Sequence, residues 1–172
     1  MRFFIVVLFS VGIGYMGLAQ RTDRTNFRAG LNGGVVTGDF SDTHSLTLGV
    51  DIYQHWGVSK ELDLGFTTGF VNAFGEKKSI TNGGLTIETE FDNIQFIPVA
   101  GSLRIYPFSG FKFGADLGYA VGINKDNGGG FLYRPSIGVD LNQGSSELNI
   151  SYFAVNDEAT FSCVLLGFLF LF

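Results

Sequence analysis

Residues 97–123, IPVAGSLRIYPFSGFKFGADLGYAVGI, are typical of two long β-strands joined by a very short turn. Apolar residues alternate strictly with polar or small residues on both sides of the turn, which is the period of a strand with one apolar face. The apolar register includes Ile97, Leu103 and Leu117, and the opposite register includes Arg104 and Asp116. This hairpin fits a soluble β-sandwich as well as a barrel whose apolar face contacts lipid. The choice between the two folds therefore depends on the rest of the sequence.

The composition favours the membrane alternative. The chain has 172 residues, enough for one domain, and 45% of them are hydrophobic. Only 16% are charged, whereas soluble domains carry about 25%. The net charge of −5 disfavours nucleic acid as a partner, because phosphate binding requires clustered Lys and Arg. The single cysteine, Cys163, lies in an apolar stretch, which indicates an inert packing thiol.

The first 19 residues predict a secretory signal peptide. They begin with Arg2, continue as an apolar run and end in small residues, with cleavage expected between Ala19 and Gln20. An uncleaved membrane helix is the alternative, but the run is at the short limit for spanning a bilayer. Loss of Arg2 leaves 10 of the 11 basic residues and all 16 acidic residues, so the expected mature domain, residues 20–172, has a net charge of −6.

Alternating strands are the predicted means of crossing the membrane, because no apolar run beyond residue 19 is long enough for a spanning helix. Eight strands are predicted, at residues 27–37, 44–56, 62–74, 94–106, 111–123, 131–141, 147–155 and 160–172. Most approach or exceed the roughly 9–11 residues of a tilted transmembrane strand, whereas strands of soluble domains average about 5–6 residues.

The predicted connections alternate in character, and the longest of them, residues 75–93, belongs to one of the two alternating sets. Residues 57–61, 108–110 and 142–146 form short turns, and the opposite set is formed by residues 38–43, 75–93, 124–130 and 156–159. Outer-membrane barrels have short periplasmic turns and longer external loops. We therefore predict an all-β fold, an eight-stranded antiparallel up-and-down transmembrane β-barrel with the longer loops outside.

The charged residues deep in these strands all fall on the polar register when the apolar residues alone set the faces. Four basic and four acidic residues share this register, and they predict a lumen charge network of Arg28, Asp51, Asp63, Arg104, Lys112, Asp116, Arg134 and Asp140. Balanced charge suggests pairing inside a narrow lumen, because an unpaired buried charge is costly.

Aromatic residues near the strand ends predict membrane-interface belts. Phe27, Trp56, Phe111 and Phe172 are assigned to the periplasmic boundary, and Phe74, Phe131 and Tyr133 to the outer one. The alternative is that they are core aromatics of a soluble β protein. Pro98 and Pro135 lie inside predicted strands, where proline removes a ladder donor, so a local bulge is predicted at each.

The last strand carries a resemblance to a known family. It ends at Phe172 with Phe168 and Phe170 in the same register, which resembles the carboxy-terminal signal of bacterial outer-membrane barrels. With the signal peptide and eight strands, the chain resembles the small outer-membrane β-barrel family of Gram-negative bacteria, of the OmpA-like transmembrane type. The resemblance implies an outer-membrane location with lipid as the surrounding partner. The opposite register of this strand, with Cys163 and Leu165, is less polar than elsewhere, which suggests packing against a plug, a partner or the amino-terminal segment.

The sequence shows little sign of catalytic chemistry. Its two histidines, His44 and His55, lie at opposite ends of one predicted strand, roughly 36 Å apart at about 3.3 Å per residue, so they cannot share a site. His44 is interpreted as a surface loop histidine in preference to a catalytic partner of Asp42. Metal-ligand spacings, phosphate loops and nucleophile elbows are missing from the sequence. We expect no enzyme activity, no metal and no cofactor.

The segment at residues 75–93, GEKKSITNGGLTIETEFDN, is the best place for a binding function. Its TIETEF part alternates, so a β-hairpin that extends beyond the membrane could capture a protein partner by strand addition. A solvated extension without a ligand is the alternative. Eight strands leave an interior just wide enough for side chains, so the predicted role is structural or partner docking. A porin-like narrow channel or small-ligand carrier and a lipid-modifying enzyme are the alternatives.

Overall fold

The computed structural model describes residues 25–82, 85–125 and 127–172 of the chain. The predicted signal peptide at residues 1–19 and its cleavage site lie outside the described residues. None of the described helices has the length and apolar character needed to span a bilayer.

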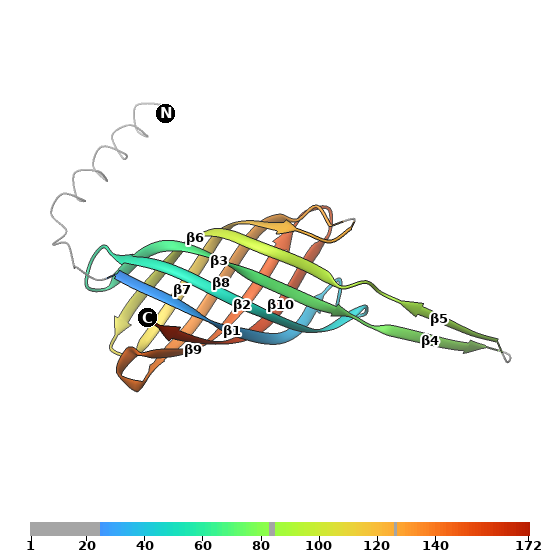
Figure 1. Cartoon of the computed structure of the whole chain (residues 1–172), viewed down its shortest axis with the longest axis horizontal. Helices are drawn as coiled ribbons and strands as arrows, with labels where there is room; N and C mark the ends of the chain where they lie inside the picture. The colour runs from blue at the N-terminus through green and yellow to red at the C-terminus, as the bar shows by residue number, and fades with distance from the viewer. Residues whose placement is uncertain (1–24, 83–84, 126) are drawn as a thin grey trace, which may run out of the picture.

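Eight long strands close into one antiparallel barrel (Figure 1). They are β1 (Thr25–Gly38), β2 (His44–Gly57), β3 (Leu62–Gly75), β6 (Ile94–Phe108), β7 (Phe111–Gly122), β8 (Gly130–Leu141), β9 (Ser146–Asn156) and β10 (Thr160–Leu171). Neighbours along the chain pair in order, and β10 pairs with β1 to close the ring. The predicted fold class is confirmed, and every predicted strand boundary lies within two residues of the observed one.

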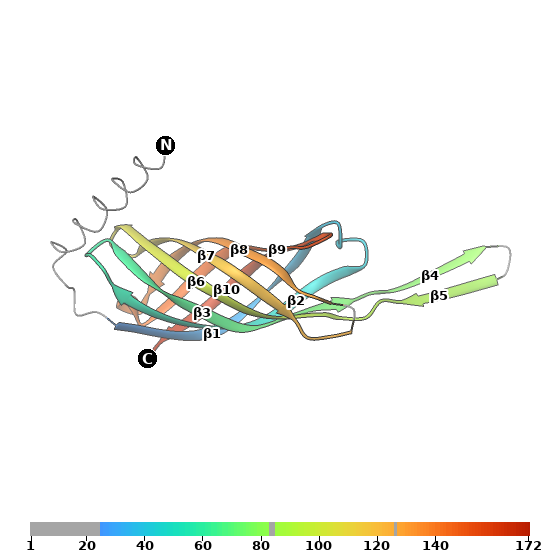
Figure 2. The ribbon, with the colours of Figure 1, turned by 90° about the horizontal axis from the view of Figure 1, so that it is seen from above.

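Two further strands form a separate two-stranded sheet outside the barrel. These strands, β4 (Lys77–Asn82) and β5 (Leu85–Glu90), project far beyond the barrel in both views (Figures 1 and 2). The Phe91 amide donates to the Glu76 carbonyl at 3.1 Å, which closes the base of the hairpin. The hairpin expected within residues 75–93 is therefore present.

The two ends of the barrel differ in their connections. The loop end carries the β1–β2, β3–β6, β7–β8 and β9–β10 connections, including the projecting hairpin. The turn end carries the β2–β3, β6–β7 and β8–β9 connections, and β10 ends there (Figure 1). A 3₁₀ turn, Asn142–Gly144, forms part of the β8–β9 connection.

The outside of the barrel is an apolar surface. Large aliphatic and aromatic side chains point outward from all eight strands, for example Leu31, Phe66 and Ile150, which are 68%, 65% and 57% exposed. Soluble proteins rarely expose a contiguous apolar patch of such extent, whereas a transmembrane barrel presents an apolar band to lipid. The outward register predicted from alternation is confirmed.

The bulges predicted at Pro98 and Pro135 are wrong. At Pro98 the β3–β6 pairing is interrupted, but Thr68 pairs with Val99 and Val71 with Phe96, so equal numbers of residues lie on both sides. The β8–β9 register is also unchanged across Pro135. Next to each proline, hydrogen bonds to one neighbouring strand are missing, but neither strand contains an extra residue. The register shifts occur instead at 44–47 in β2 and 105–108 in β6.

Candidate functional site

Two cations and two carboxylates meet across the lumen near the turn end. Lys112 on β7 contacts the Asp140 carboxylate and donates to Glu147 Oε2 at 2.7 Å. Arg28 on β1 contacts the same Glu147 oxygen. Because β1 and β7 are opposite each other in the ring, the Arg28–Glu147–Lys112 chain crosses the barrel interior.

A second ion pair spans the lumen nearer its middle. Arg134 on β8 donates from Nη1 and Nη2 to the two carboxylate oxygens of Asp51, both at 2.7 Å. The two strands that carry them, β8 and β2, are diametrically opposite in the ring. Asn32 donates to Asp51 at 2.8 Å, and Arg134 Nε donates to Ser151 at 3.0 Å. This bidentate pair is the geometry that guanidinium and carboxylate groups favour.

Asp116 collects a third group of polar contacts. It accepts from Arg104 at 2.8 Å, from Ser102 at 2.6 Å and from the Tyr53 hydroxyl at 3.1 Å. The Arg104 guanidinium also lies 4.6 Å from the centroid of the Tyr53 ring. His55 contacts Ser102 at 2.8 Å and extends the group toward the turn end. Charged side chains of different strands are thus joined to one another across the polar part of the lumen by hydrogen bonds and ion pairs.

Glycine makes room for these long side chains. A Cβ at Gly114 would lie 2.6 Å from Arg104 Nη1 and 2.3 Å from Ser136 Oγ. A Cβ at Gly167 would lie 2.6 Å from Asn149 Oδ1. These separations are below van der Waals contact, so a Cβ at either position would force Arg104, Ser136 or Asn149 to shift.

The lumen toward the loop end is apolar. We call its buried filling the apolar plug, and it consists of Val36, Val71, Ala73, Phe96, Ala100, Ala120, Leu132, Phe153, Val155, Phe161, Cys163 and Leu165. Phe96 lies between Phe161 and Phe153, with ring centroids 5.2 and 6.2 Å away. The apolar inward register of β10 therefore packs against other strands of the barrel itself. Cys163 is fully buried in this plug.

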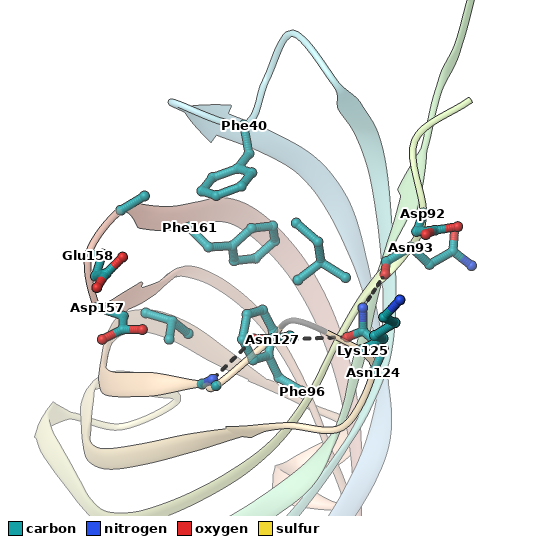
Figure 3. Close-up of a pocket in the computed structure, with 15 residues that line it drawn as sticks. Phe40, Asp92, Asn93, Phe96, Asn124, Lys125, Asn127, Asp157, Glu158 and Phe161 are labelled. Atoms are coloured by element: carbon teal, nitrogen blue, oxygen red, sulfur yellow. Dashed lines mark hydrogen bonds between the residues drawn. The ribbon is translucent and has the colours of Figure 1, made fainter. Parts of the chain in front are cut away.

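A cavity of about 380 Å³ opens above the plug at the loop end (Figure 3). Its floor is apolar and includes Phe40, Phe96 and Phe161. The polar lining comes from three connections and comprises Asp92, Asn93, Asn124, Lys125, Asn127, Asp157 and Glu158. We call this space the mouth cavity. A concave apolar site with a few convergent polar groups is the usual form of a small-molecule site.

Asparagine side chains hold one wall of the mouth cavity. Asn124 Nδ2 donates to the Asn93 carbonyl at 2.7 Å, and its Oδ1 accepts from the Gln95 amide at 2.9 Å. Asn127 Nδ2 donates to the Gln95 carbonyl at 2.9 Å, while its Oδ1 accepts from the Gly129 amide at 3.1 Å. These bonds tie the β7–β8 connection to the start of β6, so the wall is pre-formed.

The eight residues predicted as a lumen charge network all point into the barrel. Seven are buried, and Asp140 is partly buried with a side-chain exposure of 19%. Asp63 accepts from Tyr106 at 2.6 Å and from Asn26 at 3.1 Å. Any role of these residues beyond structure stays a prediction.

The expected charge balance is wrong because sequence reasoning missed Glu147. Its carboxylate is buried between Lys112 and Arg28, which makes five acidic and four basic groups among the described strand residues of the lumen. The signal was available, since Glu147 shares the inward register with Asn149 and Ser151.

His44 is not the surface loop histidine that the sequence suggested. It is only 4% exposed, and its Nε2 lies 2.9 Å from the Asp92 carbonyl oxygen. Its Nδ1 lies 2.9 Å from Thr43 Oγ1, and its ring packs edge-on against Phe40. His44 thus fastens the β1–β2 connection to the base of the hairpin.

The predicted interface aromatics lie at the ends of the strands. Phe27, Trp56 and Phe172 are exposed at the turn end, and Phe74 and Phe131 at the loop end, while Phe111 and Tyr133 are partly covered. Phe27 packs on Phe172 with centroids 6.1 Å apart. Tyr133 packs on Tyr152 at 6.2 Å, and Phe111 on Phe108 at 5.1 Å.

Known proteins share this fold, with little sequence in common. No protein-family model and no curated protein matches the sequence. The backbone structure of the Yersinia pestis outer membrane protein Ail in a phospholipid bilayer nanodisc matches with a TM-score of 0.55 at 13% identity, covering 86% of this chain and 98% of that one. The crystal structure of Ail, the attachment invasion locus protein of Yersinia pestis, matches with a TM-score of 0.50 at 9% identity, covering 86% and 96%. The fold and the apolar exterior of this chain are those of a small bacterial outer-membrane β-barrel.

Proposed function

We propose that this outer-membrane barrel conducts no solutes and docks a partner protein through the β4–β5 hairpin, with the loop end facing the outside of the cell. The observation that carries the proposal is the contrast between a filled lumen and a hairpin that extends far beyond the barrel (Figure 2). Short periplasmic turns and longer external loops support this orientation.

Two successive layers support a closed lumen. The Arg134–Asp51 pair and the Arg28–Glu147–Lys112 chain cross the interior, and the apolar plug fills the space toward the loop end. The space between Arg28, Tyr53 and Arg104 is too small for a water molecule. An ion would have to displace buried Phe rings and break paired charges, and both steps are costly.

The hairpin offers backbone hydrogen-bonding groups to a partner. Within the described residues, β4 pairs only with β5, so the outer edge of each strand is open to strand addition. Around it, the described part of the loop end is acidic. Its charged residues are Asp39, Asp42, Glu76, Glu88, Glu90, Asp92, Asp157 and Glu158 against Lys77, Lys78 and Lys125, eight acidic and three basic. Charge complementarity therefore favours an extended, basic segment of a partner protein.

Site-specific photo-crosslinking in cells tests the docking role. A photoreactive residue at Lys78 or Thr89, a cross-strand pair with exposed side chains, is expected to yield a defined adduct with one protein that contains a basic segment. The same residue at Ser109, exposed in the β6–β7 turn, is the control. No adduct at Lys78 and Thr89, or an equal adduct at Ser109, would contradict docking by the hairpin.

Planar-bilayer recording tests the closed lumen separately. The purified barrel is expected to give no unit conductance steps under conditions in which a general porin, added as a positive control, does conduct. Reproducible conductance steps that change in the Arg104→Ala variant would show that the lumen conducts, and they would contradict the proposal that it is closed.

A further inference from the structure

We propose that the mouth cavity binds a small organic cation that has a flat apolar body. The body would lie against the half-buried Phe40, above the buried rings of Phe96 and Phe161, and the ammonium group would lie beside Asp157 and Glu158. This ligand site is distinct from the hairpin edge and goes beyond protein docking.

The floor of the cavity suits a flat apolar body. Phe161 lies between Phe40 and Phe96, with ring centroids 5.9 and 5.2 Å away, and all three rings border the cavity (Figure 3). The volume of about 380 Å³ is within the range of small-molecule sites, about 300–1,000 Å³. Aromatic faces also attract organic cations through the ring quadrupole.

The charges of the rim select a cation and orient it. Figure 3 shows Asp157 and Glu158 together on one side of the cavity, whereas Lys125 lies on the other side with Asp92. Among the described residues, none donates a hydrogen bond to the Asp157 or Glu158 carboxylate or forms an ion pair with it. The β9–β10 side is therefore an uncompensated negative edge beside an aromatic floor, which favours an ammonium group there.

The wall opposite this edge does not need to rearrange for binding. The side-chain amides of Asn124 and Asn127 are already bonded to the backbone of Asn93, Gln95 and Gly129. A pre-formed wall lowers the ordering cost of binding.

Ligand-observed NMR with the full barrel in lipid nanodiscs tests the site. The probes are tryptamine, its neutral analogue indole-3-ethanol and its anionic analogue indole-3-propionate, which share one aromatic body. We expect tryptamine to bind tightest and indole-3-propionate weakest after subtraction of empty nanodiscs. The double variant Asp157→Asn/Glu158→Gln is expected to weaken tryptamine about fivefold, the effect of losing roughly 1 kcal/mol of partly screened attraction, and to leave indole-3-ethanol unchanged.

Two further variants separate the floor from the rim. Phe40→Ala is expected to weaken tryptamine and indole-3-ethanol alike, because both lose the same ring contact. Glu88→Gln/Glu90→Gln removes two acidic groups from the hairpin and is expected to change neither. Equal affinity for the three probes, or equal loss of tryptamine in both double variants, overturns the inference. Heat-modifiable gel migration checks that each variant is folded.

Discussion

Lys112 is a residue on which the turn-end charge group depends, because its buried ammonium contacts both Asp140 and Glu147. Lys112→Met would leave Arg28 as the one cation, among the described residues, within ion-pair distance of these carboxylates. We expect the free energy of unfolding to fall by about 3–5 kcal/mol, the usual effect of removing one partner of a buried ion pair. Urea titration of the barrel in lipid vesicles measures this loss.

The matched control is Lys77→Met in the hairpin. Lys77 forms a 2.9 Å ion pair with Glu90, but these side chains are 76% and 66% exposed. Solvent screening limits such a pair to less than about 1 kcal/mol. Comparable losses in the two variants would contradict the importance of the buried charge group.

Gly114 faces the lumen and has less room for a side chain than Gly101, which faces lipid. Gly114→Ala would push Arg104 away from Asp116, and we expect it to destabilise the barrel by about 1–3 kcal/mol, as overpacking does. At Gly101 a Cβ would meet only the Leu117 carbonyl oxygen at 3.8 Å, an ordinary contact. Gly101→Ala is therefore the control, and the same urea titration compares the two. An unchanged midpoint for Gly114→Ala would refute the steric account.

At the scale of the element, we expect the barrel to fold without the β4–β5 hairpin, because these two strands form a sheet of their own. The Phe91 amide bonds to the Glu76 carbonyl, and the Glu76 amide bonds to the Thr43 carbonyl at 2.8 Å, so the hairpin base is held by the barrel end. Replacing residues 77–90 by a short Gly-Ser turn is expected to leave heat-modifiable migration unchanged and to abolish the partner adduct. If the variant without residues 77–90 no longer folded, the hairpin would be required for the stability of the barrel.

At the scale of the whole molecule, the outward apolar surface requires lipid or detergent. The chain without residues 1–19 is expected to associate in buffer without detergent, because large apolar side chains cover the outside of every barrel strand. In detergent it is expected to migrate faster on a gel before boiling than after it. Analytical ultracentrifugation checks the first expectation. A folded monomer in plain buffer would overturn the transmembrane assignment.

Local alternation was sufficient to predict the strands, their outward faces and the inward direction of the predicted charges. A strand places successive side chains on opposite faces, so residues such as Leu117 and Asp116 could be assigned to a face without knowledge of any distant contact. The same rule explains why Glu147 could have been included, since it shares a face with Asn149. Proline was harder, because Pro98 interrupts hydrogen bonds without requiring a bulge.

The sequence by itself determined a barrel with an apolar exterior and charged residues inside, in which the hairpin of residues 97–123 turns its apolar face outward. Only the tertiary structure decided which charges meet, because Arg134 and Asp51 are 83 positions apart and face each other only when the ring closes with one stagger. Closure also decided that inward apolar residues of several strands, such as Phe96 and Phe161, gather at one level as the apolar plug. Alternation is a local property of the backbone, whereas the depth at which a side chain lies depends on the register of all eight strands together.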